Sequence, residues 1–243
     1  MENGSNPDDS QSALLQAGSL QYVQSTIQYS EQQTISLANK QLERQAVTSI
    51  KAPATITEPL LLASTSPRRA EILRAAGWSF EIVPGSVDET RHADEDAITY
   101  VRRLAEAKCK AAADKLTTGL VLGADTTVVV HEEILGQPAD DDDARRMLRL
   151  LRGGWHEVIT GVALVRAGGR SDYVVDHEST RVRFSEMSDE EIEWYVATGE
   201  TKGKAGAYGI QGAAALFIEE IAGDYLNIVG LPLRLVYNLS KRM

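Results

Sequence analysis

The positions of apolar and polar residues predict alternating strands and helices from about residue 60 to the end of the chain. Strands are predicted where apolar residues form short runs or alternate with polar ones, at 60–63, 80–83, 119–130, 158–165, 174–184 and 216–221. Helices are predicted where apolar residues recur three and four positions apart, at 67–76, 94–116, 140–151, 188–196 and 231–239. This alternation predicts an α/β domain with a mixed, twisted sheet flanked by helices.

Local signals support several of these boundaries. Pro67 suits the first turn of a helix, because its missing N–H would have no helical partner there. Ser188 and Glu191 have the spacing of a capping box. The run Asp140–Asp143 is typical of an acidic first helical turn. Within 119–130, two apolar runs are separated by Gly123–Asp125, so the end of the first run is the expected place of the Asp125 carboxylate.

Residues 1–57 differ in composition from the rest of the chain. Nine of the 11 glutamines lie in the first 50 residues, and eight serines accompany them. Such a low-complexity, Gln/Ser-rich extension buries too little apolar area to order itself, so we expect it to be disordered or partly helical. A helix that docks a partner is the alternative. The predicted folded domain is then 58–243.

Composition and charge narrow the class of protein. Apolar residues make up 43% and charged residues 25%, which is ordinary for a globular domain. The single cysteine, Cys109, excludes a disulfide framework, and the start of the chain lacks the pattern of a signal peptide, so we expect a cytoplasmic protein. No apolar run approaches the roughly 18 residues of a membrane span. The net charge of −10 disfavours nucleic-acid polymers and anionic membranes as partners.

The segment Ser64–Arg69 is the first candidate for chemistry. It follows a predicted strand and opens a predicted helix, where unpaired N–H groups and the helix dipole attract anions. Three hydroxyls and the two arginines, Arg68 and Arg69, make this segment suited to phosphates. The alternative is a serine that caps the helix beside surface arginines.

Three further groups are weaker on their own. Asp125 could hold a divalent cation or accept a proton from water, or it could be an ordinary turn residue. Glu106 and Lys110 have the spacing of a helical ion pair, and Glu106 and Lys108 are too close in sequence to face the same way on one helix. In 204–212, small residues surround a Gln that could read the edge of a base.

Together these segments resemble the Maf family of nucleoside triphosphate pyrophosphatases. The resemblance covers about 60–240 and rests on collinear motifs: LLASTSPRRAEIL (61–73), VDET (87–90), YVRRLAEAKCKAA (100–112), VLGADTTVVV (121–130), HEVITGVAL (156–164), YVATGE (195–200), KAGAYGIQG (204–212) and NIVGLPL (227–233). It implies a Maf/Ham1-like fold, with two lobes around a deep cleft, and a homodimer. The implied reaction splits a nucleoside triphosphate into the monophosphate and pyrophosphate, with a divalent cation that is Mg²⁺ or, alternatively, Mn²⁺.

The resemblance also implies roles for individual residues. Asp125 would be the proton acceptor, and a metal would be held by Asp125 with two glutamates, Glu89 and Glu106. The phosphates would be bound by five residues: Ser64, Ser66, Arg69, Lys108 and Lys204. Substrate choice would rest on Arg68, Thr126 and Gln211, which match the branch of the family that acts on dTTP and UTP, with modified pyrimidine triphosphates as further candidates.

The sequence departs from the family pattern at two positions. Gln137 stands in a stretch where the family often has Lys, which predicts weaker stabilisation of the triphosphate or a compensating cation. Gly203 stands where an acid often precedes Lys204. The alternative function implied by the resemblance is a non-catalytic, nucleotide-binding regulator of cell division and septum formation.

Overall fold

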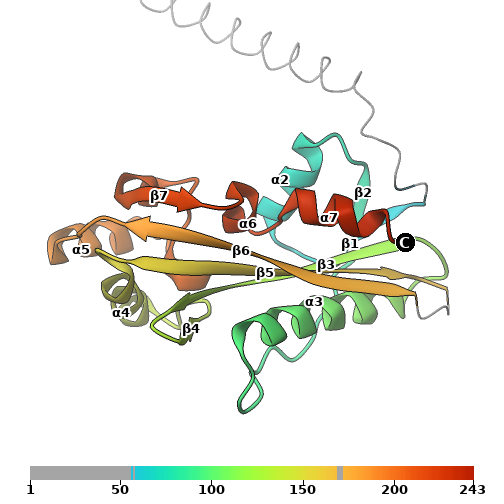
Figure 1. Cartoon of the computed structure of the whole chain (residues 1–243), viewed down its shortest axis with the longest axis horizontal. Helices are drawn as coiled ribbons and strands as arrows, with labels where there is room; N and C mark the ends of the chain where they lie inside the picture. The colour runs from blue at the N-terminus through green and yellow to red at the C-terminus, as the bar shows by residue number, and fades with distance from the viewer. Residues whose placement is uncertain (1–55, 57, 169–171) are drawn as a thin grey trace, which may run out of the picture. The chain divides into compact units, whose positions relative to one another are not determined.

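The computed structural model describes residues 56, 58–168 and 172–243, and Figure 1 shows them around one central sheet. The predicted Gln/Ser-rich extension lies outside the described residues, apart from Ile56. The sheet has seven strands: β1 (Leu60–Leu62), β2 (Phe80–Ile82), β3 (Leu120–Val130), β4 (Glu133–Leu135), β5 (Trp155–Arg166), β6 (Tyr173–Phe184) and β7 (Ile218–Ala222). Their order is β2-β1-β3-β5-β6-β7, with β4 paired to β3. The β1 strand runs parallel to β2 and β3, and the other pairs are antiparallel, so the predicted mixed sheet is confirmed.

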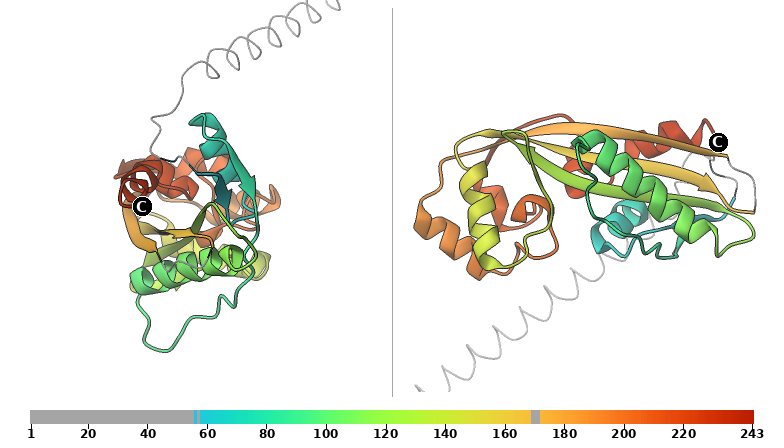
Figure 2. Two further views of the ribbon diagram at one scale, coloured as in Figure 1. Left: turned by 90° about the vertical axis from the view of Figure 1, so that its right-hand side faces the viewer. Right: turned by 90° about the horizontal axis from the view of Figure 1, so that it is seen from below.

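Helices lie on both faces of this sheet. They are α2 (Pro67–Ala75), α3 (Ala97–Ala113), α4 (Asp141–Leu151), α5 (Asp189–Ala197), α6 (Tyr225–Val229) and α7 (Leu233–Ser240), with the 3₁₀ turns η1 (Ala205–Ala207) and η2 (Ala213–Phe217). The α3 helix covers one face, while α2, α6 and α7 lie over the other (Figures 1 and 2). No helix in the described part of the chain is both long enough and apolar enough to cross a bilayer.

Two glycines let α3 approach the sheet closely. A Cβ on Gly123 of β3 would lie 2.5 Å from the Ala105 carbonyl oxygen, and a Cβ on Gly161 of β5 would overlap the Val101 carbonyl. The buried face of α3, which includes Ala105 and Cys109, packs directly over these positions. This close approach sets how far a side chain of α3 must reach to meet β3.

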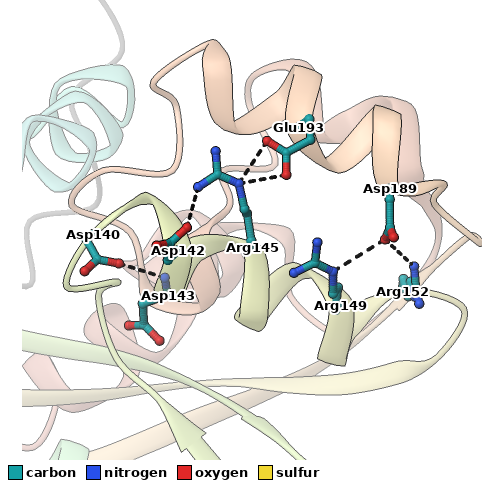
Figure 3. A network of polar contacts seen from close by, with 8 residues as sticks. All are labelled: Asp140, Asp142, Asp143, Arg145, Arg149, Arg152, Asp189 and Glu193. Atoms are coloured by element: carbon teal, nitrogen blue, oxygen red, sulfur yellow. Dashed lines mark hydrogen bonds and ion pairs between the residues drawn. The ribbon is translucent and has the colours of Figure 1, made fainter.

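The opposite ends of the long strands pack against different helices. At one end, the core joins β3, β5 and β6 to α4, α5 and η2, and at the other it joins them to β1, α2 and α7. Ion pairs across the surface of α4 and α5 hold these two helices together (Figure 3). Arg145 Nε lies 2.8 Å from Glu193, and Asp189 lies 3.1 Å from Arg152 Nη1 and 3.4 Å from Arg149 Nε. The α5 helix is therefore fixed by its buried face and by its exposed charges.

The strand predicted at 119–130 is confirmed as β3, and the alternative of Asp125 as a turn residue is wrong. The strand continues through Gly123–Asp125 to Val130. The antiparallel ladder with β5 is unbroken from Leu120 to Val129 and pairs Asp125 with Gly161. Because every step of the ladder pairs backbone groups, the strand tolerates a glycine and a carboxylate in its middle. The site carboxylate is thus carried by the sheet itself.

Several short elements were not predicted. They are β4, α6, η1 and η2. Each has five residues or fewer, so local periodicity cannot identify it, and its tertiary contacts decide its conformation. The predicted strand at 216–221 is observed as β7, which begins after the last turn of η2.

Candidate active site

A cavity of about 570 Å³ lies between the start of α2, the middle of β3 and the segment 200–212. Ten of the eleven predicted site residues line it: Ser64, Ser66, Arg68, Arg69, Glu89, Lys108, Asp125, Thr126, Lys204 and Gln211. The eleventh, Glu106, is not among the lining residues and forms an ion pair with Lys110 on α3. The structure therefore gives no support for Glu106 as a metal ligand. The pair of Glu106 and Lys110 matches the alternative interpretation, an ion pair within the helix.

The candidate phosphate-binding segment, Ser64–Arg69, begins α2 without a side-chain cap. Ser66 precedes α2 in an extended conformation, and its side chain makes no capping hydrogen bond. The Ser64 hydroxyl instead accepts hydrogen bonds from the Ser66 N–H at 3.2 Å and from Arg69 Nη1 at 3.1 Å. The interpretation of Ser66 as a side-chain cap is therefore wrong, and the first turn of α2 faces the cavity without one.

Arg69 joins three distant segments at the cavity. Its Nε donates to the Gly230 carbonyl at 2.8 Å, and its Nη2 donates to the Thr126 hydroxyl at 3.1 Å. Burial lowers the pKa of the guanidinium, while the charge of Asp125 works in the opposite direction. The Gly230 backbone has a φ of +118°, a left-handed conformation that glycine adopts without steric cost. Arg69 therefore brings positive charge close to Asp125 and orders the cavity wall.

Asp125, Lys108 and Glu89 form the polar centre of the site. Lys108 Nζ lies 2.6 Å from Asp125 Oδ1 and 2.7 Å from Glu89 Oε1. Asp125 is 8% exposed, and burial raises the pKa of its carboxyl, while Lys108 and then Arg69 counteract that rise. Lysine and aspartate meet because α3 approaches β3 so closely. This arrangement places a buried carboxylate beside a cation at the edge of an open cavity.

The carboxylates fit a divalent cation that arrives with a phosphate ligand. Within the described residues, no group of three or more His, Cys, Asp or Glu side chains is placed to hold a metal. Asp125 and Glu89 nevertheless both line the cavity and both reach the same Lys108 nitrogen. Mg²⁺ is commonly bound by one or two carboxylates, with substrate phosphates and waters as its other ligands. The two carboxylates match that donor set.

The opposite wall comes from the segment after α5. The Lys204 ammonium donates to the Glu200 carbonyl, and burial lowers the pKa of Lys204. Arg68 Nη2 donates to the Gly203 carbonyl at 3.3 Å, which links the α2 wall to this one. Gln211 is exposed and lines the cavity. Charged groups from two walls thus face the same space.

Some lining residues were not predicted as site residues. Gln137, which the sequence singled out only as a departure from a family pattern, lines the cavity, and so do Glu200 and Tyr208. Apolar lining comes from Val128, Val158, Ile210, Ile228 and Val229. Glu200 and Tyr208 lie within quoted motifs, but no residue pattern indicated their side chains. The cavity can therefore take an anionic group beside charged residues and a less polar group beside apolar ones.

Comparison with known proteins agrees with this geometry. A family model described as Maf-like protein matches residues 59–243. A dTTP/UTP pyrophosphatase of Koribacter versatilis is 49% identical over 183 residues, which cover 75% of this chain and 93% of that protein. A dTTP/UTP pyrophosphatase of Symbiobacterium thermophilum is 52% identical over 177 residues, which cover 72% and 89%. A solved Ham1 protein of Staphylococcus aureus matches with a TM-score of 0.39 and 15% identity, over 52% of this chain and 72% of its own, which is too weak to support a conclusion.

Proposed function

The chain belongs to the Maf family, and on that premise we propose that it hydrolyses dTTP and UTP to the nucleoside monophosphate and pyrophosphate. The observation that carries the proposal is one cavity, which is lined by the ion-paired Asp125, Lys108 and Glu89 and also by the arginines of α2 and Gln211. The alternative, a non-catalytic regulator of cell division, has no observation in its favour.

Asp125 is proposed as the general base. A water would attack the α-phosphorus, the bond from that phosphorus to the oxygen bridging it to the β-phosphorus would break, and pyrophosphate would leave with that oxygen. The proton of the water passes to Asp125 Oδ. Burial raises the pKa of this carboxyl, and a base with a raised pKa accepts a proton more readily at neutral pH. Lys108 and Arg69 keep the carboxylate ionised and stabilise negative charge on the phosphates.

A divalent cation is part of the proposal. Asp125 and Glu89 would hold it together with oxygens of the triphosphate, and Glu106 is left out because it pairs with Lys110. When bound, the cation neutralises phosphate charge. Mg²⁺ suits two carboxylates and phosphate oxygens, and Mn²⁺ takes the same kind of ligands.

Base selection is assigned to Arg68, Thr126 and Gln211. The Gln211 amide offers a donor and an acceptor side by side, as does the imide edge of uracil or thymine. Thr126 is held by Arg69 and by the Thr160 hydroxyl at 3.0 Å, so its position is well defined. Modified pyrimidines that keep the imide edge remain candidate substrates, and the homodimer remains a prediction.

The test is pyrophosphate release from dTTP, UTP, CTP, GTP and 7-methyl-GTP with Mg²⁺, for the wild type and for Asp125→Asn. We expect release from dTTP and UTP that falls by at least a hundredfold in the variant, because general-base catalysis contributes about 10²–10⁴ in rate. Binding of UTP without release of pyrophosphate would refute the enzyme and favour the binding protein. Release that survives Asp125→Asn would refute the role of this carboxylate.

A further inference from the structure

The turn that carries Gln211 is held at both ends by side chains that come before it in the chain. At the first end, the Gly209 N–H donates to the Tyr195 hydroxyl at 3.3 Å. At the second end, the Ala213 N–H donates to both carboxylate oxygens of Glu200, at 3.2 Å and 3.0 Å. The turn is closed by a hydrogen bond from the Gly212 N–H to the Gly209 carbonyl at 3.1 Å. Gln211 therefore lies between two fixed backbone groups.

The Glu200 carboxylate lies directly against this turn. A Cβ on Gly212 would overlap the carboxylate, so the close approach requires a glycine. Burial raises the pKa of the Tyr195 phenol to about 12, and the charge of Glu200 adds to that rise. Tyr195 is therefore protonated at neutral pH, and its hydroxyl oxygen accepts the hydrogen bond from the Gly209 N–H. Tyr195 holds the first end of the turn, and Glu200 holds the second.

The residues that hold the turn are themselves well anchored. Tyr195 is fully buried on α5, and α5 is bound to α4 by the ion pairs in Figure 3. The Glu200 carbonyl accepts a hydrogen bond from Lys204, which orders the backbone on the other side of the carboxylate. Gln211 is exposed and has no comparable packing of its own, so its position depends on the turn beneath it.

We propose that Glu200 is a positioning residue for base selection, which fixes the turn Gly209–Ala213 so that Gln211 presents its amide to the pyrimidine. The inference rests on the proposed function. Recognition by an amide needs its donor and acceptor held within about 0.5 Å of the productive geometry. Both oxygens of the Glu200 carboxylate are engaged by the Ala213 N–H, so Glu200 acts on selectivity through the turn.

The kinetic test compares UTP with CTP, whose base carries an amino group in place of the O4 carbonyl and lacks the N3 proton. Glu200→Ala should raise the KM for UTP and lower the UTP-over-CTP ratio of kcat/KM about tenfold, the effect of one hydrogen bond of about 1.4 kcal/mol. The kcat for UTP should change by less than about threefold, because Asp125 and Lys108 are untouched. Glu200→Gln keeps an oxygen that accepts from Ala213 and should restore most of the selectivity. Glu190→Ala removes an exposed carboxylate from the first turn of α5 and should leave the ratio unchanged.

Two measurements distinguish a positioning role of Glu200 from direct contact of Glu200 with the base. In a Gln211→Ala background, Glu200→Ala should lower the selectivity no further, because the turn then has no side chain to position. Hydrogen exchange of the Ala213 amide should be faster in Glu200→Ala than in the wild type. A further loss of selectivity in the Gln211→Ala background would overturn the proposal in favour of direct contact of Glu200 with the base. Unchanged exchange together with unchanged selectivity would overturn it by showing that Glu200 has no part in base selection.

Two binding measurements separate this inference from the proposed function. If the wild type hydrolyses none of the nucleotides, the proposed function fails, and the selectivity of UTP over CTP is then measured as a ratio of binding constants. Inorganic tripolyphosphate, which has no base, should inhibit or bind the wild type and Glu200→Ala equally. A change in tripolyphosphate affinity as large as the change for UTP would show that Glu200 shapes the phosphate site, and would refute its role in base selection.

Discussion

His156 is held inside the protein as a neutral side chain, and this predicts how stability depends on pH. It lies on β5, is 3% exposed, and its Nε2 is 2.8 Å from the Tyr208 hydroxyl. The rings of Phe184 and Tyr208 pack edge-on against it, with centroids 5.1 and 5.3 Å away. No partner for its Nδ1 is found among the described residues. Burial lowers the pKa of this imidazole to about 4.

The direction of the pH effect follows from the protonation of His156 in the folded and the unfolded chain. Above about pH 6.5, the ordinary pKa of histidine, His156 is neutral in both the folded and the unfolded chain, so it makes no difference to stability. As the pH falls from about 6.5 towards about 4, the unfolded chain binds a proton that the folded chain does not, and stability is lost. The linkage relation gives a loss of about 2 kcal/mol at pH 5 and about 3 kcal/mol at pH 4.

The assay is urea unfolding at pH 7 and pH 5 for the wild type and for His156→Phe. The phenyl ring keeps the aromatic packing but cannot bind a proton, so the variant should lose about 2 kcal/mol less than the wild type between the two pH values. The unpaired Tyr208 hydroxyl costs about 1–3 kcal/mol at both pH values, and this cost cancels in the difference. His131→Asn is the control, because His131 is exposed and has a φ of +48° that Asn tolerates. Equal losses in the wild type and His156→Phe would refute the reasoning.

Three further changes probe the site and its support. Lys108→Gln removes the cation beside Asp125, so the pKa of that carboxyl should rise further and the acid limb of the kcat/KM profile should move to higher pH; an unmoved limb would exclude Asp125 as the titrating base. Gly123→Ala forces a methyl group against the Ala105 carbonyl and should lower the free energy of unfolding in urea by about 1–3 kcal/mol. Gln137→Lys adds a charge to the cavity wall and should lower the KM for UTP severalfold, whereas an unchanged KM would place the residue away from the phosphates.

Local signals predicted the elements that local physics stabilises. The capping box at Ser188 and Glu191 is confirmed with both of its hydrogen bonds. Pro67 begins α2, and the helix expected at 94–116 is observed as α3. Asp140 caps α4 through its side chain. In each case the determining contacts lie within about four residues of one another, so the pattern of residues contains them.

Ten of the eleven expected site residues line one cavity, and their roles were implied by the resemblance to the Maf family, while residue patterns alone indicated the segment Ser64–Arg69. Ser64 to Arg69 follow a strand and open a helix, and this order alone indicates an anion site. For Glu106 and Lys108, the structure was needed to decide which side chain reaches the cavity. Both are polar and both lie on α3, but only Lys108 faces β3, while Glu106 pairs with Lys110. The 100° between neighbouring helix positions decides which one reaches the cavity.

Residue patterns alone were enough for the alternation of the main strands and helices and for the capping box of α5, because these depend on short-range periodicity and backbone chemistry. The tertiary structure decided which distant groups meet. Asp125 and Lys108 form an ion pair because Gly123 and Gly161 let α3 approach the sheet. Arg69 reaches the Gly230 carbonyl across 161 positions of sequence. Such contacts depend on strand register and helix packing. Because the whole core sets both, these contacts cannot be predicted from any one segment of the sequence.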